Sequence, residues 1–408
     1  MSLIRPFRGL RPVPEHAADV VAPPYDVLNT EEARERAAGR PLSFLHISKA
    51  EIDLPEGTDP YDASVYARAA ENLKRLVDEG VLIRETRPVY YVYRLTMGDH
   101  QQTGLVAAAS VADYDSNRIR KHEYTRPAKE DDRVRQIEAL NAQTGPVLLA
   151  YRSQDDVDRL IASVTDQAPL YDLVAGDGIG HAFWILDDTD TIERLTRAFD
   201  AMPAIYIADG HHRSAAASRV AASKNGPPDA MSRYFLSVIF PHRQMKIFDY
   251  NRVVKDLNGL TPAGFLDQVG EHMNVTPSDA PVRPGKPGEF GMYLDGRWYR
   301  LNIEPGRVPQ DPVARLDVSL LADNLLQPVL GIADPRTDAR IDFVGGIRGL
   351  EGLEQRVDSG DMRVAFSMYP TSMDDLMAVA DAEKVMPPKS TWFEPKLADG
   401  LVSHVLDD

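Results

Sequence analysis

The chain has 408 residues, of which 43% are hydrophobic and 26% are charged, a composition typical of a globular protein with two or three domains. It contains no cysteine, which excludes disulfides, thiolate catalysis and cysteine-ligated zinc. A formal net charge of -16 argues against a nucleic-acid partner, because such binding needs a positive face that releases counterions. No stretch has the apolar length of a signal peptide or a membrane span, so we expect a cytoplasmic protein without a membrane partner.

Hydrophobic patterns and turn residues predict alternating strands and helices, as in a mixed α/β (α+β) fold. The first 30 residues are irregular and end in the proline-restricted segment VAPPYDVL, which is either the lining of a cleft or a structural arm. Further along, we expect helices at 60–79, from about 129, and at 213–223, 318–330 and 373–385. We expect strands at 183–186, 204–208 and 234–240. Hairpins are expected at 89–111 and 290–303.

A stretch rich in proline and glycine between 276 and 288 indicates a division of the chain nearby. We expect an N-terminal α/β domain over residues 1–260 and a C-terminal α+β region over residues 261–408. The segment MPPKST near the end is too rich in proline for regular structure, and we expect an arm there that can return to the site of the first domain.

The sequence IADGHHR marks the junction between a buried strand and an alanine-rich helix. We expect Asp209 to cap this helix, with Gly210, His211 and His212 in its first turn. Basic side chains there oppose the helix dipole, which favours negative charge, and they make sense when an anion lies in front of them. Arg213 adds a planar fork that suits phosphate. The alternative is that Asp209 caps the helix while the histidines bond to backbone carbonyls.

A second charged segment, KHEYTRPAKEDDR, leads into a helix. Lys129 and Arg133 lie four residues apart and share a helix face, where like charges repel unless an anion or a carboxylate lies between them. We expect this pair to face phosphate, and a solvated surface is the alternative. Glu123 is the expected general base for a substrate hydroxyl, or else a metal ligand, and His122 and His212 are the other expected catalytic residues.

Lys389, in the MPPKST segment, is expected to reach a phosphate, although the segment could instead tie two domains together. The glycines of a P-loop are missing upstream of it. Nitrogen and oxygen ligands for a divalent ion could come from His122, Glu123, Asp209, His211, His212 and His242. No dedicated metal site is predicted, however, because no HExxH spacing occurs and neighbouring histidines on a helix point about 100° apart. Mg²⁺ that enters with a nucleotide is easier to accommodate.

Two resemblances add to these expectations. IADGHHR followed by an alanine-rich helix resembles the signature of the ParB/sulfiredoxin-like superfamily, in which a Gly-x-x-Arg turn holds nucleotide phosphates and some members are small-molecule serine kinases. Nearly the whole chain resembles a bacterial and archaeal family that is called domain of unknown function 1015. Five motifs in the same order carry this resemblance: VAPPYDVL, KHEYTRPAKEDDR, IADGHHR, FPHRQMKI and MPPKSTWFEPK. The resemblances imply a ParB/sulfiredoxin-like nucleotide-binding core with an additional α+β region, and the second hints at serine or phosphoserine chemistry.

Together these features predict a nucleotide-dependent phosphotransferase that acts on a small hydroxyl metabolite, with serine or phosphoserine as first candidates. The expected cofactor is ATP or ADP with Mg²⁺. A phosphohydrolase of a small phosphorylated metabolite and a non-catalytic nucleotide-binding regulatory module are the alternatives. The expected partner is a small molecule, and a homo-oligomer is left open. The expected phosphate- and nucleotide-binding residues are Asp209, Gly210, His211, His212, Arg213, Lys129, Arg133 and Lys389.

Overall fold

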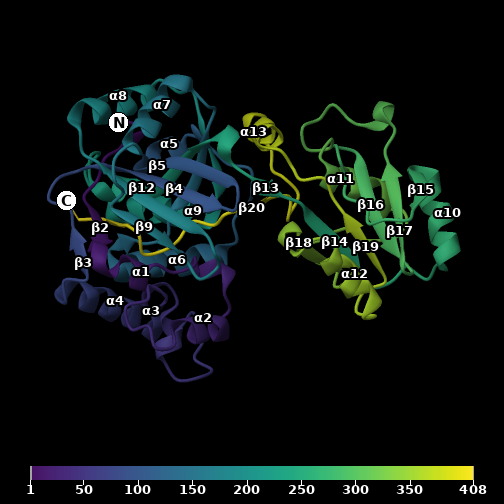
Figure 1. Cartoon of the computed structure of the whole chain (residues 1–408), viewed down its shortest axis with the longest axis horizontal. Coiled ribbons are helices and arrows are strands. Elements are labelled where there is room, and N and C mark those ends of the chain that lie inside the picture. Colours follow the sequence, from purple (N-terminus) through teal and green to yellow (C-terminus); the bar gives the residue numbers. More distant parts are fainter. Residues whose placement is uncertain (1, 408) are drawn as a thin grey trace. The chain divides into compact units, whose positions relative to one another are not determined.

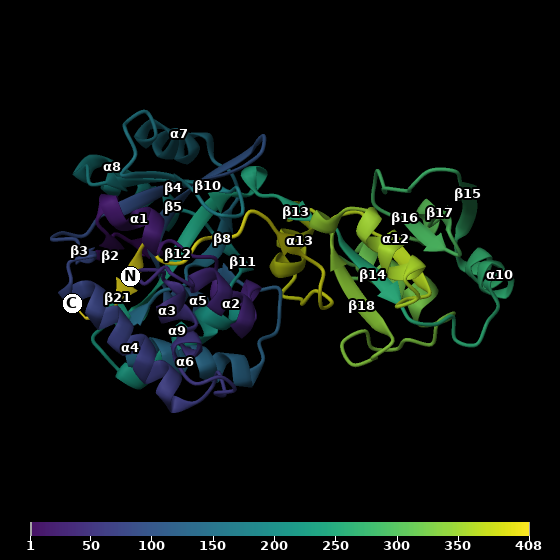
Figure 2. The same cartoon turned by 60° about the horizontal axis from the view of Figure 1, so that its bottom comes forward.

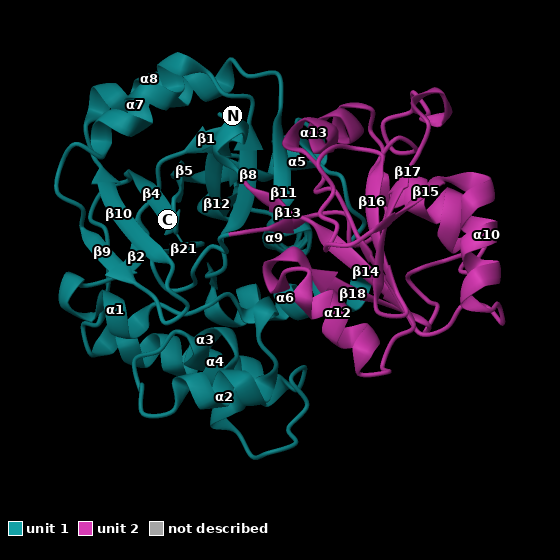
Figure 3. Ribbon diagram, turned by 45° about the vertical axis from the view of Figure 1, so that its right-hand side comes forward, with its two compact units in different colours: residues 1–245, 395–408 teal, residues 246–394 magenta. Residues whose placement is uncertain are grey.

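A computed structural model describes residues 2–407 of the chain. The chain forms two compact units, one of residues 1–245 with 395–408 and one of residues 246–394 (Figure 3). The expected division at residue 260 thus lies inside the second unit, and the last residues of the chain return to the first. The fold class is mixed α/β, as expected.

The first unit is built on a nine-stranded mixed sheet whose strands come from distant parts of the sequence (Figure 1). Their order is β6, β11, β8, β12, β5, β4, β10, β9, and β1 pairs with the end of β5. Two pairs are parallel, β6 with β11 and β8 with β12, and the others are antiparallel. The strands are β1 (Ile4–Arg5), β4 (Tyr90–Met97), β5 (His100–Ser110), β6 (Ile119–Arg120), β8 (Val147–Tyr151), β9 (Tyr171–Val174), β10 (Gly180–Leu186), β11 (Ile205–Asp209) and β12 (Tyr234–Pro241).

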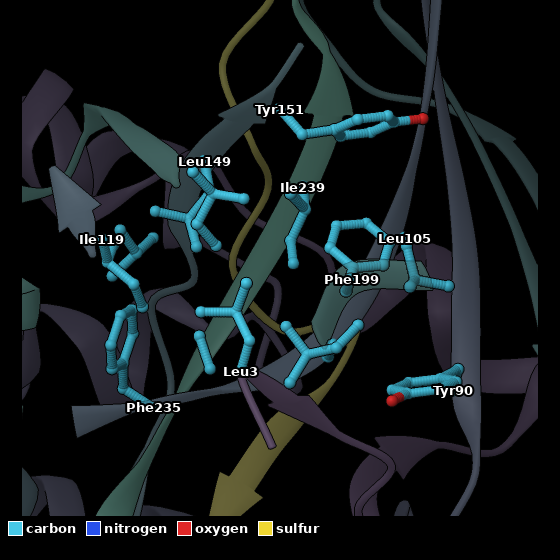
Figure 4. Packing of buried hydrophobic residues seen from close by; sticks show 14 of the residues in the cluster. Leu3, Tyr90, Leu105, Ile119, Leu149, Tyr151, Phe199, Phe235 and Ile239 are labelled. Carbon is cyan, nitrogen blue, oxygen red and sulfur yellow. The ribbon is translucent and has the colours of Figure 1, made fainter. Parts of the chain in front are cut away.

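The main core of the first unit joins this sheet to helices α7 (Asp155–Val164) and α8 (Thr189–Asp200), which lie together in Figures 1 and 2. Alternate residues of each strand point into this core, because side chains alternate between the faces of a sheet. Leu105 of β5, Ile239 of β12 and Phe199 of α8 lie side by side there (Figure 4). The expected hairpin is confirmed as β4 and β5.

On the side of the unit away from α7 and α8, helix α6 (Pro127–Leu140) packs against α9 (His211–Lys224) and α4 (Ala63–Asp78) (Figure 3). Ala216 and Val220 of α9 are buried in this contact. The alanine-rich sequence of α9 leaves room for a neighbouring helix to come close. The helix that carries the second half of KHEYTRPAKEDDR is therefore held directly against the helix that follows the DGHHR turn.

A second, four-stranded antiparallel sheet holds both ends of the chain in the first unit. Its order is β3, β2, β21, β7, so that β21 from the C-terminus lies between β2 and β7. The helix expected at 60–79 is α4, and its cap is Asp62, which accepts a bond from the Ser64 N–H. The remaining elements are β2 (Gly9–Pro12), β3 (Leu82–Arg84), β7 (Ala142–Gln143), β21 (Ser403–Val405), α1 (Ala17–Val20), α2 (Thr30–Ala37), α3 (Leu45–Ser48) and α5 (Val111–Asp115).

The second unit is a six-stranded antiparallel sheet in the order β15, β17, β16, β19, β14, β18, with a separate pair of β13 and β20. The hairpin expected at 290–303 is confirmed as β16 and β17. The helix expected at 318–330 is shorter, because α11 runs on into a π-helical turn at Ala322–Leu326. The elements are β13 (Ile247–Phe248), β14 (Tyr250–Val254), β15 (Asn274–Ser278), β16 (Glu289–Leu294), β17 (Arg297–Asn302), β18 (Ile341–Gly345), β19 (Val364–Ser367), β20 (Trp392–Phe393), α10 (Pro262–His272), α11 (Asp317–Leu321), α12 (Glu351–Asp358) and α13 (Met373–Asp381).

Within residues 2–407, none of the helices has both the length and the apolar character needed to cross a bilayer.

Candidate functional site

Two loops that the sequence singled out come together because the strands before them pair in parallel. β6 ends at Arg120 and β11 ends at Asp209, and the two strands are neighbours at the edge of the large sheet. Parallel strands end at the same edge of a sheet, so the segments that follow them emerge side by side. The loop at 121–126 therefore lies next to the turn at Gly210, which opens α9.

The turn between β11 and α9 depends on Gly210. Its φ is +101°, and a Cβ there would lie 3.3 Å from the Cα of Val147 and 3.2 Å from the Nε of Arg213. Only glycine adopts this conformation freely. Gly210 occupies the cap position of α9, so the expectation that Asp209 caps the helix is wrong. The carboxylate of Asp209 pairs instead with Lys396, whose Nζ lies 3.4 Å from Oδ2.

His211 and His212 point in different directions from the first turn of α9, as neighbouring helical residues must. His211 is buried, and its Nε2 accepts a long bond of 3.4 Å from the N–H of His122. The two rings cross at 88° with their centroids 4.5 Å apart, and Nδ1 of His211 lies 3.9 Å from the carboxylate of Glu123. The Nε2 of His212 accepts a bond of 3.0 Å from the N–H of Arg126. The structure thus brings His122, Glu123, His211 and His212 together.

The three histidines of this cluster are uncharged at neutral pH. Burial, reinforced by the neighbouring ring of His122, holds the pKa of His211 well below its usual value. Burial lowers the pKa of His122 to about 4, and burial together with the charge of Lys129 lowers the pKa of His212. The premise that these histidines carry positive charge at the start of the helix is therefore wrong, because desolvation favours the neutral ring.

Arg213 keeps its charge, but acidic groups of the protein balance it. Its guanidinium lies 3.6 Å from Asp26 and 3.9 Å from Asp209, donates to the carbonyl of Pro146, and belongs to a side chain that is 11% exposed. Burial opposes the charge, yet Asp26 and Asp209 raise the pKa of Arg213. Burial likewise opposes ionisation of Asp209, but Lys396 and Arg213 lower its pKa. An external anion is not needed to explain Arg213, so the charge argument that gave it a phosphate no longer applies.

The expected pair of Lys129 and Arg133 on α6 lines a cavity of about 180 Å³, and His212 lines the same cavity. Arg133 is nearly buried, lies 2.6 Å from the carboxylate of Asp132 and stacks on the ring of Tyr25 at 3.8 Å. Its charge is therefore balanced within the protein. Lys129 is the residue of the pair better placed to bind a ligand in the cavity.

The same cavity contains groups that the sequence analysis missed. Lys49 and Glu51 line it and pair at 2.9 Å, with Glu51 buried, and Asp26 lines it as well. The motif VAPPYDVL was a signal for Asp26, whereas Lys49 and Glu51 lie in an ordinary sequence without a recognisable pattern. With both signs of charge on its walls, the cavity suits a small ligand that is itself zwitterionic or rich in hydroxyl groups.

A second cavity of the first unit, of about 300 Å³, is lined by the preceding residues of the same segment. Residues 21–24 give it an apolar wall, Arg36, Arg40 and Lys396 give it positive charge, and Asp177 adds one carboxylate. Lys396 connects this cavity to the DGHHR turn through its ion pair with Asp209. The VAPPYDVL segment thus lines both cavities, as the cleft-lining alternative predicted.

Lys389 belongs to the second unit, whereas the other expected site residues belong to the first. Its carbonyl accepts a bond of 3.0 Å from Arg252, and its ammonium lies 5.4 Å from the ring centroid of Tyr250. These contacts hold the MPPKST segment on the second unit. A role for Lys389 at a phosphate stays a prediction.

Among residues 2–407, one group of side chains has a composition and spacing that could accommodate a metal ion. His122, Glu123 and His211 each offer a ligand atom, and these atoms lie within 4.8 Å of one another. The sequence analysis weighed these residues among possible ligands but predicted no dedicated site, and His211 and His212 do diverge in the helical turn. The ligand set arises instead between two segments that are distant in the sequence.

Three solved structures are similar to the chain at a low level. A mutant free serine kinase in complex with AMP is 15% identical with a TM-score of 0.36, over 78% of this chain and 94% of that chain. A conserved hypothetical protein from Pyrococcus furiosus is 15% identical with a TM-score of 0.34, over 72% and 95%. SbnI with a C-terminal truncation, from Staphylococcus aureus, is 12% identical with a TM-score of 0.39, over 72% and 85%. Likeness at this level says nothing about activity.

None of the curated proteins matches the sequence with significance. The model of one protein family does match, over residues 4–319, and this span contains four of the five motifs that carried the whole-chain resemblance. The chain belongs to that family, which is described as a protein of unknown function, DUF1015.

Proposed function

We propose that this protein transfers a phosphoryl group from a nucleotide to the hydroxyl group of a small metabolite. The observation that carries the proposal is that residues flanking Gly210 are connected to both cavities. His212 lines the smaller cavity, and Lys396, paired with Asp209, lines the larger one. The unpaired N–H groups and the dipole at the N-terminus of α9 favour an oxyanion at this turn. A phosphoryl group held there could pass from a nucleotide in the larger cavity to a metabolite hydroxyl group in the smaller cavity.

The larger cavity suits the nucleotide. The apolar wall of residues 21–24 can cover a base, while Arg36, Arg40 and Lys396 can pair with phosphate oxygens. We expect ATP or ADP in this cavity, with Mg²⁺ carried in on the phosphates, because phosphoryl transfer depends mainly on positioning and on positive charge.

The smaller cavity suits the acceptor. Lys129 can bind an anionic group of the metabolite, and Asp26 and Glu51, each of which also has a cationic partner in the protein, offer further carboxylate oxygens to a cationic group, so that serine is the first candidate. The hydroxyl oxygen forms the new bond to phosphorus, the bond to the leaving oxygen of the nucleotide breaks, and the hydroxyl proton passes to a base.

Glu123 is the proposed base for this proton. His212 is less suited to the role, because its Nε2 already accepts a bond from the Arg126 N–H and its other nitrogen then carries a proton. His212 can instead donate that N–H to a phosphate oxygen. Lys129 is the proposed cation beside the transferring group.

The test is incubation of the purified full chain with ATP or ADP, Mg²⁺ and serine or another small hydroxyl metabolite, followed by phosphorus NMR. We expect a phosphorylated metabolite to appear as the nucleotide loses its terminal phosphate. Lys129→Ala should lower kcat/KM by roughly 100-fold, since one group that stabilises the transferring charge has an effect of about this size. Lys74→Ala is the matched control, because this lysine of α4 is 74% exposed.

The other outcomes separate the alternatives. Release of inorganic phosphate from a phosphorylated metabolite, without any nucleotide, would identify a phosphohydrolase. Saturable nucleotide binding without turnover would identify a regulatory module. Absence of nucleotide binding by the folded protein would contradict both the phosphotransferase and the regulatory module.

A further inference from the structure

His122 is 2% exposed, yet neither of its ring nitrogens has a hydrogen-bond partner within the described part of the chain. A buried imidazole with unsatisfied nitrogens is costly, so its presence calls for an explanation. The carbonyl of Ile207 lies close to the ring, although not in good hydrogen-bond geometry. In metal sites, a ligating histidine commonly turns one ring N–H towards a backbone carbonyl and binds the ion through the other nitrogen.

We propose that His122, Glu123 and His211 bind a divalent transition-metal ion. Their ligand atoms lie within 4.8 Å of one another. Ligands that coordinate one ion at about 2.1 Å cannot lie more than about 4.2 Å apart, so the set must contract slightly. The side chain of Glu123 is 55% exposed and can turn towards the ion, and small shifts of the His122 and His211 rings complete the contraction.

The fold explains how the three ligands meet. His122 and Glu123 directly follow β6, and His211 begins the helix that follows β11, so the parallel pairing of these strands holds the set together. Nδ1 of His211 faces Glu123 at 3.9 Å and is the ligand atom of that ring. Binding there puts the ring proton on Nε2, so the 3.4 Å contact from the His122 N–H has to open.

Two imidazoles and one carboxylate favour Zn²⁺, Fe²⁺ or Mn²⁺ over Mg²⁺, which prefers oxygen ligands. Three protein ligands leave further coordination positions, and the exposed Glu123 side leaves the site open to solvent. One carboxylate oxygen of Glu123 on the ion leaves the other oxygen able to accept a proton. The inference does not rest on the proposed phosphoryl transfer, because the ion needs no nucleotide to bind.

The experiment is isothermal titration of the metal-stripped full chain with Zn²⁺, Co²⁺ or Mg²⁺ in the absence of nucleotide. We expect one Zn²⁺ or Co²⁺ per chain, a raised Tm in its presence, and no comparable response to Mg²⁺. Glu123→Gln should weaken the affinity by at least about tenfold, since even partners outside the ligand set have effects of that size. His212→Gln is the control, because this neighbouring ring turns to Arg126 and its loss should leave the metal affinity unchanged.

Glu123→Cys gives a second readout at an exposed position. The chain has no other cysteine, so the variant carries a single thiol. With Co²⁺ it should show a thiolate-to-cobalt charge-transfer absorption that the wild type lacks. Absence of this absorption, absence of Zn²⁺ binding by the wild type, or unchanged affinity in Glu123→Gln would overturn the proposal. None of these results affects the phosphotransferase test, which detects a phosphorylated product.

Discussion

Arg213 illustrates how burial decides the role of a basic side chain. The sequence analysis assigned it to phosphate, but the folded chain surrounds it with Asp26 and Asp209. Asp399 lies close as well, and burial raises the pKa of that carboxyl to about 7 despite the charge of Arg213. The guanidinium therefore acts as the central cation of an internal ionic network, and its first effect should be on stability.

We expect Arg213→Ala to lower the free energy of unfolding by about 3–5 kcal/mol, because it leaves buried carboxylates without their cation. Urea unfolding followed by circular dichroism measures the change. Arg219→Ala is the matched control on the same helix, since that side chain is 45% exposed and its ion pairs with Glu130 and Asp131 should contribute at most about 1 kcal/mol. An Arg213→Ala protein of normal stability that no longer binds nucleotide would return this residue to the ligand site.

The charge states of the site could not be read from the sequence. The density of ionisable residues in KHEYTRPAKEDDR and IADGHHR correctly marked segments that come together. Whether His211 is charged depends on its burial, and whether Arg213 needs an external anion depends on Asp26, which lies far away in the sequence. Both are consequences of tertiary packing, which local patterns do not encode.

Among the elements, the turn from β11 to α9 depends on the left-handed conformation of one glycine, Gly210. We expect Gly210→Ala to destabilise the protein by more than the roughly 1–2 kcal/mol that a left-handed conformation costs any residue with a Cβ. The excess arises because the new Cβ meets the backbone of Val147 at 3.3 Å as well as Arg213. Chemical unfolding of Gly210→Ala beside the wild type measures the difference.

Gly39→Ala is the control for this prediction. Gly39 also has a positive φ, of +72°, but a Cβ added there has no neighbour within 4 Å. Both variants place a Cβ on a residue with positive φ, so the difference between them reports mainly the crowding at the turn. Equal loss of stability in both would show that the contact with Val147 relaxes without cost.

Elements with strong local patterns were predictable, as the hairpin of β4 and β5 and the alanine-rich helix α9 show. The elements that build the site were harder to predict. β6 has only two residues, too few to give a periodic signal, yet its parallel pairing with β11 brings the two loops together. β21 is also short, and its place between β2 and β7 depends on residues hundreds of positions away.

At the scale of the whole molecule, the second unit is an insertion in the first. The chain enters it at Lys246 and leaves it at Glu394, and these residues are neighbours, since the Glu394 N–H donates to the Lys246 carbonyl at 3.3 Å. The next residues pair as β13 and β20, with Ile247 opposite Phe393. The core around the large sheet lies within the first unit, and the cluster that contains Val253 and Leu353 lies within the second.

We therefore expect the first unit to fold when residues 246–394 are replaced by a short glycine–serine linker. Of the three tryptophans, only Trp184 remains in this chain, and because it is buried its fluorescence reports unfolding of the first unit alone. A cooperative transition in urea is the expected result. The matched comparison is a chain that ends at residue 245, which also has Trp184 alone but lacks β21 and should lose this transition, because β2 and β7 then have no strand between them.

The chain in which a glycine–serine linker replaces residues 246–394, called the linked chain below, also separates the predicted site residues by unit. It keeps the cavities of about 180 and 300 Å³ and the set of His122, Glu123 and His211, but it lacks Lys389. If Lys389 has no part in binding, both Zn²⁺ and nucleotide should bind the linked chain with the affinity of the full chain. A chain that folds and binds Zn²⁺ normally but binds nucleotide weakly would assign part of the nucleotide site to the second unit. Lys389→Ala in the full chain would then show whether this lysine supplies the missing contact.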